Sequence, residues 1–129
     1  MPRILVVEDN AINRELLCDW LEAQDYAVLS AEDLGGAQRL LQGEQPDAVL
    51  LDVQLGSEDG LSLAAWMRQQ PRFSGIPVIA VTAHALVAEQ QRFLQSGCNA
   101  CISKSIDFKL LHRELGKWLV PLEKSPSGV

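Results

Sequence analysis

Five short apolar runs alternate with segments of helical periodicity along the chain, and this alternation restricts the possible fold more than any other feature. Strands connected by helices of this length must run parallel, and a parallel sheet needs both of its faces covered. The pattern therefore predicts an α/β fold, a three-layer sandwich with one sheet between two layers of helices. The expected strands are Arg3 to Val7, Ala27 to Ala31, Ala48 to Asp52, Ile76 to Thr82 and Ala100 to Ser103.

The helices between these runs are predicted from apolar residues at three-to-four spacing. The first helix begins behind a possible cap at Asn10, the fourth includes Leu86 and stops at Gly97, and the last ends at Pro121. We expect one domain over residues 1–121 and a flexible tail over residues 122–129. The apolar stripe of the first helix is Ile12, Leu16, Leu17, Trp20 and Leu21, and that of the last is Phe108, Leu111, Leu115, Trp118 and Leu119.

The charge of the chain excludes several classes of partner. Its net charge is −6, with 11 basic and 17 acidic side chains, whereas nucleic acids and anionic lipids are bound by basic surfaces. The longest apolar runs fall far short of the ~20 residues that cross a bilayer. An acidic pair follows the first apolar run directly, unlike in a signal peptide. We predict a cytoplasmic protein that binds neither nucleic acid nor membrane.

Three cysteines include a CxxC sequence, Cys98 to Cys101. A thioredoxin-type site places this pair at the start of a helix, whereas here it leads into an apparent strand. Neither a second CxxC nor a histidine pair completes a zinc site. We interpret these cysteines as small apolar residues, with a redox or metal site as the alternative.

Polar residues gather where the predicted strands end. Glu8 and Asp9 follow the first strand, Asp52 ends the third, Thr82 ends the fourth and Lys104 follows the fifth. In open parallel sheets, ligands bind at the carboxyl ends of the strands, so we expect these residues to converge. Singly, each has an ordinary explanation as a helix cap, a strand former or a surface charge. Together they predict a site where three carboxylates hold Mg²⁺ and the hydroxyl and ammonium groups bind a phosphoryl group.

These residues give the chain its resemblance to a known family, the receiver domains of bacterial two-component response regulators. The segment from Ile4 to Asn10 resembles the family's first strand and acidic pair, and Leu50-Leu51-Asp52 with Asp59-Gly60 resembles its phosphoacceptor segment. Val81-Thr82-Ala83 is similar to its hydroxyl segment, and residues 97–104 to its last strand and lysine. Asn10 with Asn13-Arg14 resembles receivers of phosphorelays and hybrid kinases.

The resemblance implies a doubly wound, flavodoxin-like sheet of order 2-1-3-4-5. It implies that Asp52 takes a phosphoryl group from a histidine kinase or histidine phosphotransfer protein. Glu8, Asp9, Asp52 and the carbonyl of Gln54 would hold Mg²⁺, while Thr82 and Lys104 would bind the phosphoryl oxygens. The protein would be a phosphoacceptor and not an enzyme, lose its phosphoryl group slowly, and signal to a downstream protein through the face around residues 83–119.

Three positions depart from the family pattern. Gly56 replaces a proline in the loop after the phosphoacceptor, so we expect a more mobile loop. Cys101 replaces the aromatic switch residue, which leaves the loop from Ala83 to Leu86 to carry the signal. Ser105 replaces a proline preceded by a cis bond, and we expect a trans bond here because cis without proline costs ~2.5–4 kcal/mol. From family positions, Gln54 and His84 would flank the water that removes the phosphoryl group.

Three rival functions remain to be distinguished. A phosphatase of the haloacid dehalogenase type has Asp-x-Asp at its nucleophile, whereas the residue two beyond Asp52 is Gln54. A flavodoxin would need a hydroxyl-rich phosphate loop where this chain has Glu8 and Asp9. A pseudo-receiver, which acts only as an interaction module, would be marked by loss of the acceptor or the acids, and all of these are present.

Overall fold

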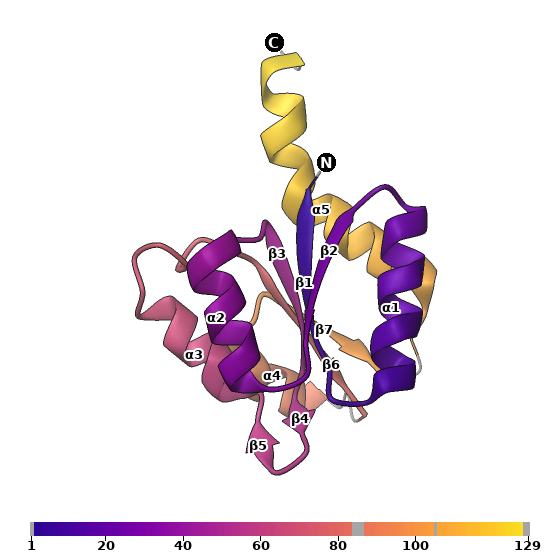
Figure 1. Cartoon of the computed structure of the whole chain (residues 1–129). Coiled ribbons are helices and arrows are strands. Elements are labelled where there is room, and N and C mark those ends of the chain that lie inside the picture. Colours follow the sequence, from indigo (N-terminus) through magenta and orange to yellow (C-terminus); the bar gives the residue numbers. More distant parts are fainter. Residues whose placement is uncertain (1, 84–86, 105, 128–129) are drawn as a thin grey trace.

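A computed structural model describes residues 2–83, 87–104 and 106–127 of the chain (Figure 1). The five long strands are β1 (Arg3–Val7), β2 (Ala27–Ala31), β3 (Ala48–Asp52), β6 (Val78–Thr82) and β7 (Ala100–Ser103). The helices are α1 (Ala11–Ala23), α2 (Leu34–Glu44), α3 (Leu61–Arg68), α4 (Val87–Gln95) and α5 (Phe108–Ser127).

The long strands form one parallel sheet of order β2-β1-β3-β6-β7. Because β6 and β7 are the fourth and fifth long strands, this confirms the predicted order 2-1-3-4-5. The predicted strand bounds are also confirmed, except that the fourth strand begins at Val78 and not at Ile76. Pro77 directly precedes this strand, and proline has no N–H to donate to a sheet.

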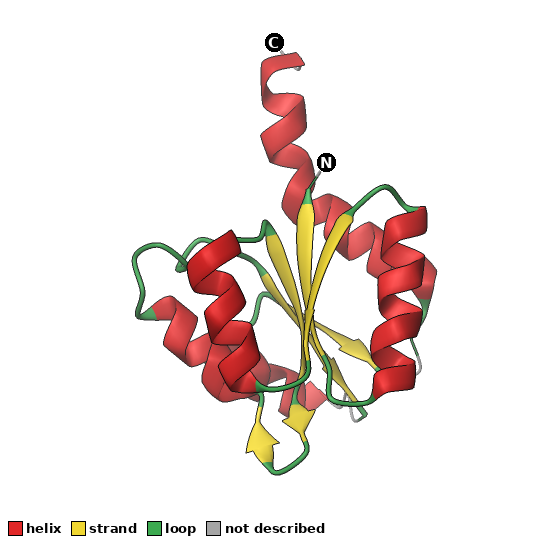
Figure 2. Ribbon diagram, in the orientation of Figure 1, coloured by secondary structure: helices red, strands yellow, loops and turns green. Residues whose placement is uncertain are grey.

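Side chains alternate between the two faces of the sheet and fill two separate cores, as a three-layer sandwich requires. In β1, Leu5 and Val7 belong to the core that α2, α3 and α4 cover. Ile4 and Val6 belong to the core that α1 and α5 cover. Figure 2 shows these helices in layers on either side of the sheet.

Helix α1 buries a narrower stripe than its sequence predicts. Leu17 and Leu21 are buried, but 78% of Ile12 and 54% of Leu16 are exposed. Both exposed residues lie in the first half of the helix, near the carboxyl edge of the sheet. Two of the five residues in the predicted apolar stripe are therefore exposed. The spacing of apolar residues did not predict this, because it does not show how far the sheet extends beneath the helix.

Helix α5 continues past its predicted end. The sequence placed this end at Pro121, but the helix runs to Ser127. A proline inside a helix costs one hydrogen bond and crowds the preceding turn, so it disfavours a helix without forbidding one. Figure 1 shows the last part of α5 projecting away from the sheet. The division into a domain, residues 1–121, and a flexible tail, residues 122–129, stays a prediction.

Arg68, at the end of α3, connects this helix to two other segments of the chain. Its guanidinium donates to the carbonyls of Gly97 (2.9 Å), Ser74 (2.9 Å) and Ile76 (2.9 Å), and to the side chain of Asn99 (2.8 Å). Burial lowers the pKa of this guanidinium. The role was not predicted from sequence, because the partners are main-chain carbonyls that no residue type reveals.

We expect Arg68→Met to lower the free energy of unfolding by about 3 kcal/mol, since the part-buried hydrogen bonds to the carbonyls of Gly97 and Ile76 lose a charged donor, and such bonds contribute ~1.5–3 kcal/mol each. The control is Arg72→Met, because within the described part of the chain the Arg72 side chain has only an exposed hydrogen bond to the carbonyl of Gln42 and a contact with the ring of Phe73. This control should lose less than ~1 kcal/mol. Urea unfolding measures both, and equal losses would contradict the assigned role.

Candidate functional site

The carboxyl edge of the sheet brings the predicted site residues together. Asp52 pairs in register with Val81, so Thr82 extends one residue beyond it in the next strand. Thr82 pairs with Ser103, and Lys104 follows directly. Glu8 and Asp52 are each only 2% exposed, and Thr82 is 6% exposed. Strand pairing therefore brings Asp52, Thr82 and Lys104 to one edge of the sheet, as predicted. Glu8 and Asp9 join them through their carboxylates, whose oxygens lie close to an oxygen of Asp52.

Lys104 lies over the buried acids. Its Nζ is 3.0 Å from Oδ2 of Asp52 and 3.8 Å from Oε2 of Glu8. Its main-chain N–H donates to the carbonyl of Thr82 at 2.6 Å, which fixes the residue at the end of β7. Burial by itself would lower the pKa of Lys104, but the hydrogen bond to Asp52 and the charges of Asp52, Glu8 and Asp9 raise it. Lys104 is thus a firmly protonated cation beside the Asp52 carboxylate.

The three carboxylates fit a divalent cation. Glu8, Asp9 and Asp52 each offer one oxygen, and these oxygens lie within 4.8 Å of one another. Burial, together with a hydrogen bond to Asp52, raises the pKa of Glu8 to about 7. Without a cation, the protonated form of Glu8 is therefore favoured, which reduces the repulsion within the cluster. Mg²⁺ prefers oxygen ligands, and a cluster of carboxylates that favours a proton when no cation is bound would be neutralised by this ion instead.

The raised pKa of Glu8 predicts how stability varies with pH. Between the usual value of 4.5 and about 7, the folded protein binds more protons than the unfolded chain, so stability falls as pH rises through this range in the presence of a chelator. Because Mg²⁺ competes with this proton, it should stabilise the fold more at about pH 8 than at about pH 5. Thermal unfolding at both pH values tests this, with Glu8→Gln as the control that removes the difference. Equal stabilisation of the wild type at both would contradict it.

The loop after Asp52 forms a two-stranded hairpin that was not predicted, while its greater mobility stays a prediction. Strands β4 (Gln54–Leu55) and β5 (Glu58–Asp59) pair antiparallel around a two-residue turn, Gly56-Ser57. Gly56 has φ +59°, a conformation closed to proline, and glycine at this first turn position is typical of a type II′ hairpin. The substitution of Gly56 for the family's proline therefore coincides with a defined turn. The signal in the sequence was the Gly-Ser pair.

The hairpin connects Asp52 to two helices. The main-chain N–H of Gln54 donates to Oδ1 of Asp52 at 3.0 Å, which orients the carboxylate. Glu58 accepts a hydrogen bond from the N–H of Leu34 at the start of α2 (3.2 Å), and Asp59 lies 3.8 Å from Arg92 of α4. Sequence analysis missed Glu58 and the Arg92 contact, because such short strands lack a clear periodicity.

The cysteines support the interpretation as apolar residues. All three are free thiols, and Cys98 is buried. Burial raises the pKa of Cys98 to about 12 and also raises the pKa of Cys101, whereas redox and metal-binding cysteines need an accessible thiolate. Cys101 packs against the core that α2, α3 and α4 cover. Among the described residues, the acidic cluster is the one metal-compatible group of His, Cys, Asp and Glu.

Some predictions fall outside the described residues. They concern His84, Leu86 and the Lys104–Ser105 peptide bond, and the loop from Ala83 to Leu86 is described only at Ala83.

Comparison with known proteins decides the family. Residues 4–116 match the family described as the response regulator receiver domain. The chain belongs to this receiver family. A polar-differentiation response regulator DivK from Brucella anthropi is 38% identical over 107 residues, which cover 82% of this chain and 87% of that protein. The rival assignments to a haloacid dehalogenase phosphatase and a flavodoxin are thereby set aside.

Solved receiver structures share the fold. The receiver domain of a sensor histidine kinase from Pseudomonas aeruginosa has a TM-score of 0.82 at 33% identity, covers 91% of this chain and 96% of its own, and carries a magnesium ion coordinated in its active site cleft. The receiver domain of a histidine kinase from Syntrophus aciditrophicus has a TM-score of 0.86 at 28% identity and covers 96% of this chain and 94% of its own.

Membership has two consequences for the site. Receivers take part in two-component signalling, and they are generally phosphoacceptors and not enzymes. The acidic cluster and Lys104 of this chain provide the pocket that such a role needs.

Among the helices that the structure describes, none is long and apolar enough to cross a membrane.

Proposed function

We propose that this protein is a phosphoacceptor in which Asp52 receives a phosphoryl group from a phosphohistidine of a histidine kinase or histidine phosphotransfer protein. One observation carries the proposal. The buried Asp52 carboxylate lies 3.0 Å from the Lys104 ammonium and shares a cluster of oxygens, within 4.8 Å of one another, with Glu8 and Asp9. This arrangement combines a nucleophile with the charges that a phosphoryl group needs.

In the proposed transfer, a carboxylate oxygen of Asp52 forms a bond to phosphorus while the bond from phosphorus to the donor's imidazole nitrogen breaks. Glu8, Asp9, Asp52 and the carbonyl of Gln54 would hold Mg²⁺, which supplies positive charge to the phosphoryl oxygens when bound. Lys104 exchanges its contact with Asp52 for one with a phosphoryl oxygen, and Thr82 donates a hydrogen bond from its hydroxyl. Slow hydrolysis of the acyl phosphate makes the protein a timed switch.

The exposed apolar residues of α1 lie on the side where a phosphodonor would approach. Ile12 and Leu16 are exposed, and Leu16 also lines a pocket of about 230 Å³ together with Glu8, Lys104, Ile106 and Phe108. An apolar surface that borders the buried acceptor fits the apolar face of a donor helix that carries the phosphohistidine. We propose that the donor docks here, in the cytoplasm as the sequence predicts.

The output partner would bind the face around residues 83–119. On this face Leu94 of α4 is 47% exposed. Cys101 is too small to report its rotamer across the face as an aromatic ring does, so we propose that the loop from Ala83 to Leu86 carries most of the change. A pseudo-receiver would use this surface without phosphorylation.

The test of phosphoacceptor function is incubation of the protein with acetyl phosphate, followed by intact mass measurement. We expect a gain of one phosphoryl group in Mg²⁺, no gain in excess chelator, and no gain for Asp52→Asn, because the nucleophile is lost. Labelling of the wild type in chelator would contradict the metal requirement. A wild type that stays unlabelled in Mg²⁺ would favour the pseudo-receiver.

A further inference from the structure

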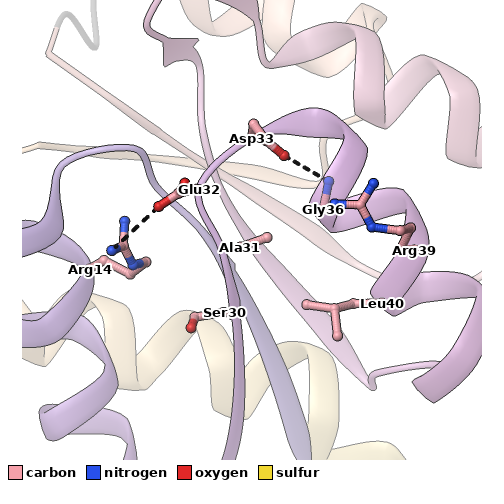
Figure 3. Close-up of a pocket in the computed structure, with 8 residues that line it drawn as sticks. All are labelled: Arg14, Ser30, Ala31, Glu32, Asp33, Gly36, Arg39 and Leu40. Atoms are coloured by element: carbon pink, nitrogen blue, oxygen red, sulfur yellow. Dashed lines mark hydrogen bonds and ion pairs between the residues drawn. The ribbon is translucent and has the colours of Figure 1, made fainter.

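Arg14, in the first turn of α1 that follows the acidic pair, reaches back to the main chain of both acids. Its guanidinium donates to the carbonyl of Glu8 at 2.9 Å and lies 3.5 Å from the carbonyl of Asp9. On its other side it lies 3.9 Å from the carboxylate of Glu32, beyond the end of β2. Figure 3 shows Arg14 and Glu32 facing each other beside a pocket of about 470 Å³.

The contact to Glu8 is protected, whereas the contact to Glu32 is not. The Arg14 side chain is 22% exposed and that of Glu32 is 72% exposed. Ion pairs with so exposed a partner contribute little, while a hydrogen bond from a charged donor to a carbonyl is among the stronger hydrogen bonds in proteins. The stronger contact of Arg14 is therefore the hydrogen bond to the segment that carries the two acids.

The same segment is also held by the hydrogen bond from the N–H of Glu8 to the carbonyl of Ala31 (3.0 Å) and by short-range contacts of its own. The N–H of Asn10 donates to Oε2 of Glu8 at 3.1 Å, and the side chain of Asn10 caps α1 by accepting from the N–H of Asn13 at 3.0 Å. Arg14 adds a connection from the helix back to the carbonyls of residues 8 and 9. Because Glu8, Asp9 and Asp52 repel one another when they are all ionised and no cation is bound, this connection opposes their separation in the free protein.

We propose that Arg14 is a positioning residue that sets the affinity of the acidic cluster for Mg²⁺. It holds the main chain of Glu8 and Asp9 so that their carboxylates stay convergent with Asp52 before the ion arrives. This inference rests on the proposed function, since it concerns the metal of the same site. It assigns a role to a residue that does not itself touch the ion.

The charge of Arg14 and its proposed positioning role predict opposite effects of its removal on the affinity for Mg²⁺, which makes the proposal testable. If Arg14 acted only through its charge, removing a cation near the acids would tighten Mg²⁺ binding. If it positions the acids, removing it weakens binding. Loss of a group that orients metal ligands typically costs ~10–100-fold in affinity, and we expect about 10-fold because Arg14 acts through the main chain.

The experiment is calorimetric titration of the folded protein with Mg²⁺. Arg14→Met keeps most of the aliphatic stem and is expected to raise the Kd about 10-fold. Arg39→Met is the matched control, because Arg39 lies on α2 and lines the same pocket (Figure 3). It removes the same charge, and its Kd should be unchanged or lower. At saturating Mg²⁺, phosphorylation of Arg14→Met by acetyl phosphate should return to the wild-type level.

A Kd for Arg14→Met equal to or below that of the wild type would overturn the proposal. If this variant fails to fold, Arg14→Lys decides, because lysine keeps the charge but lacks the planar fork. Its Kd should rise in the same direction by a smaller factor, and an unchanged or lower Kd would overturn the proposal. If the wild type binds Mg²⁺ and the Arg14 variants bind it equally well, the positioning role is wrong but the phosphoacceptor proposal stands. A wild type that binds no Mg²⁺ would contradict both proposals.

Discussion

Gly60→Ala is expected to lower the free energy of unfolding by about 3 kcal/mol and to slow phosphorylation of Asp52 on the order of 10²-fold. A Cβ at position 60 would overlap the carbonyl oxygen of Asp52 and come within 3.0 Å of the carbonyl oxygen of Val53. Both are main-chain atoms at the end of the strand that carries the acceptor. The backbone of Gly60 itself is ordinary, with φ −58° and ψ −28°, so the effect would arise from overlap alone.

The control for this substitution is Gly43→Ala in α2, where a Cβ would meet nothing within 4 Å. That variant should gain ~0.5–1 kcal/mol, because alanine favours a helix over glycine. Urea unfolding and the initial rate of labelling by acetyl phosphate measure the two effects. A Gly60→Ala variant as stable and as fast as the wild type would show that the strand end tolerates displacement.

Lys104→Met should slow phosphorylation by acetyl phosphate about 10²–10³-fold, the usual effect of removing one preorganised group that stabilises developing charge. Lys104 is the cation closest to Asp52 in the described structure, at 3.0 Å. Methionine keeps an unbranched apolar chain but cannot neutralise a phosphoryl oxygen. The rate of mass gain at saturating Mg²⁺ measures this loss without interference from altered metal affinity.

Lys117→Met provides the matched control for Lys104→Met. Lys117 lies in α5 with its side chain 66% exposed, 4.0 Å from Glu114. Its removal changes the net charge equally and should leave the rate within about twofold, a difference of only ~0.4 kcal/mol. If the two lysine variants slowed labelling to the same extent, the effect would reflect overall charge and Lys104 would have no specific role.

The sheet and the main site residues were predictable because both depend on local pattern. Buried parallel strands read as continuous apolar runs, which is why β1 and β3 were found at their observed bounds. A polar residue at the end of such a run must lie at the carboxyl edge of the sheet, because the strand ends there. Asp52, Thr82 and Lys104 could therefore be placed at one edge without knowledge of any contact.

The missed features depend on tertiary contacts or on very short elements. The exposure of Ile12 and Leu16 depends on where the sheet ends beneath α1. The hairpin of β4 and β5 has only two residues in each strand, too few for an alternating pattern. Arg14 and Arg68 act on main-chain carbonyls, which every residue carries, so sequence alone does not identify the acceptor.

The central claim is that Asp52 itself carries the phosphoryl group. The direct measurement is borohydride reduction of the acetyl phosphate-treated protein, which converts an acyl phosphate to an alcohol, followed by peptide mass mapping. We predict that the reduced residue lies at position 52 alone, and only when Mg²⁺ was present during labelling. Reduction at Glu8, Asp9 or any other carboxylate, or equal reduction in chelator, would contradict the claim.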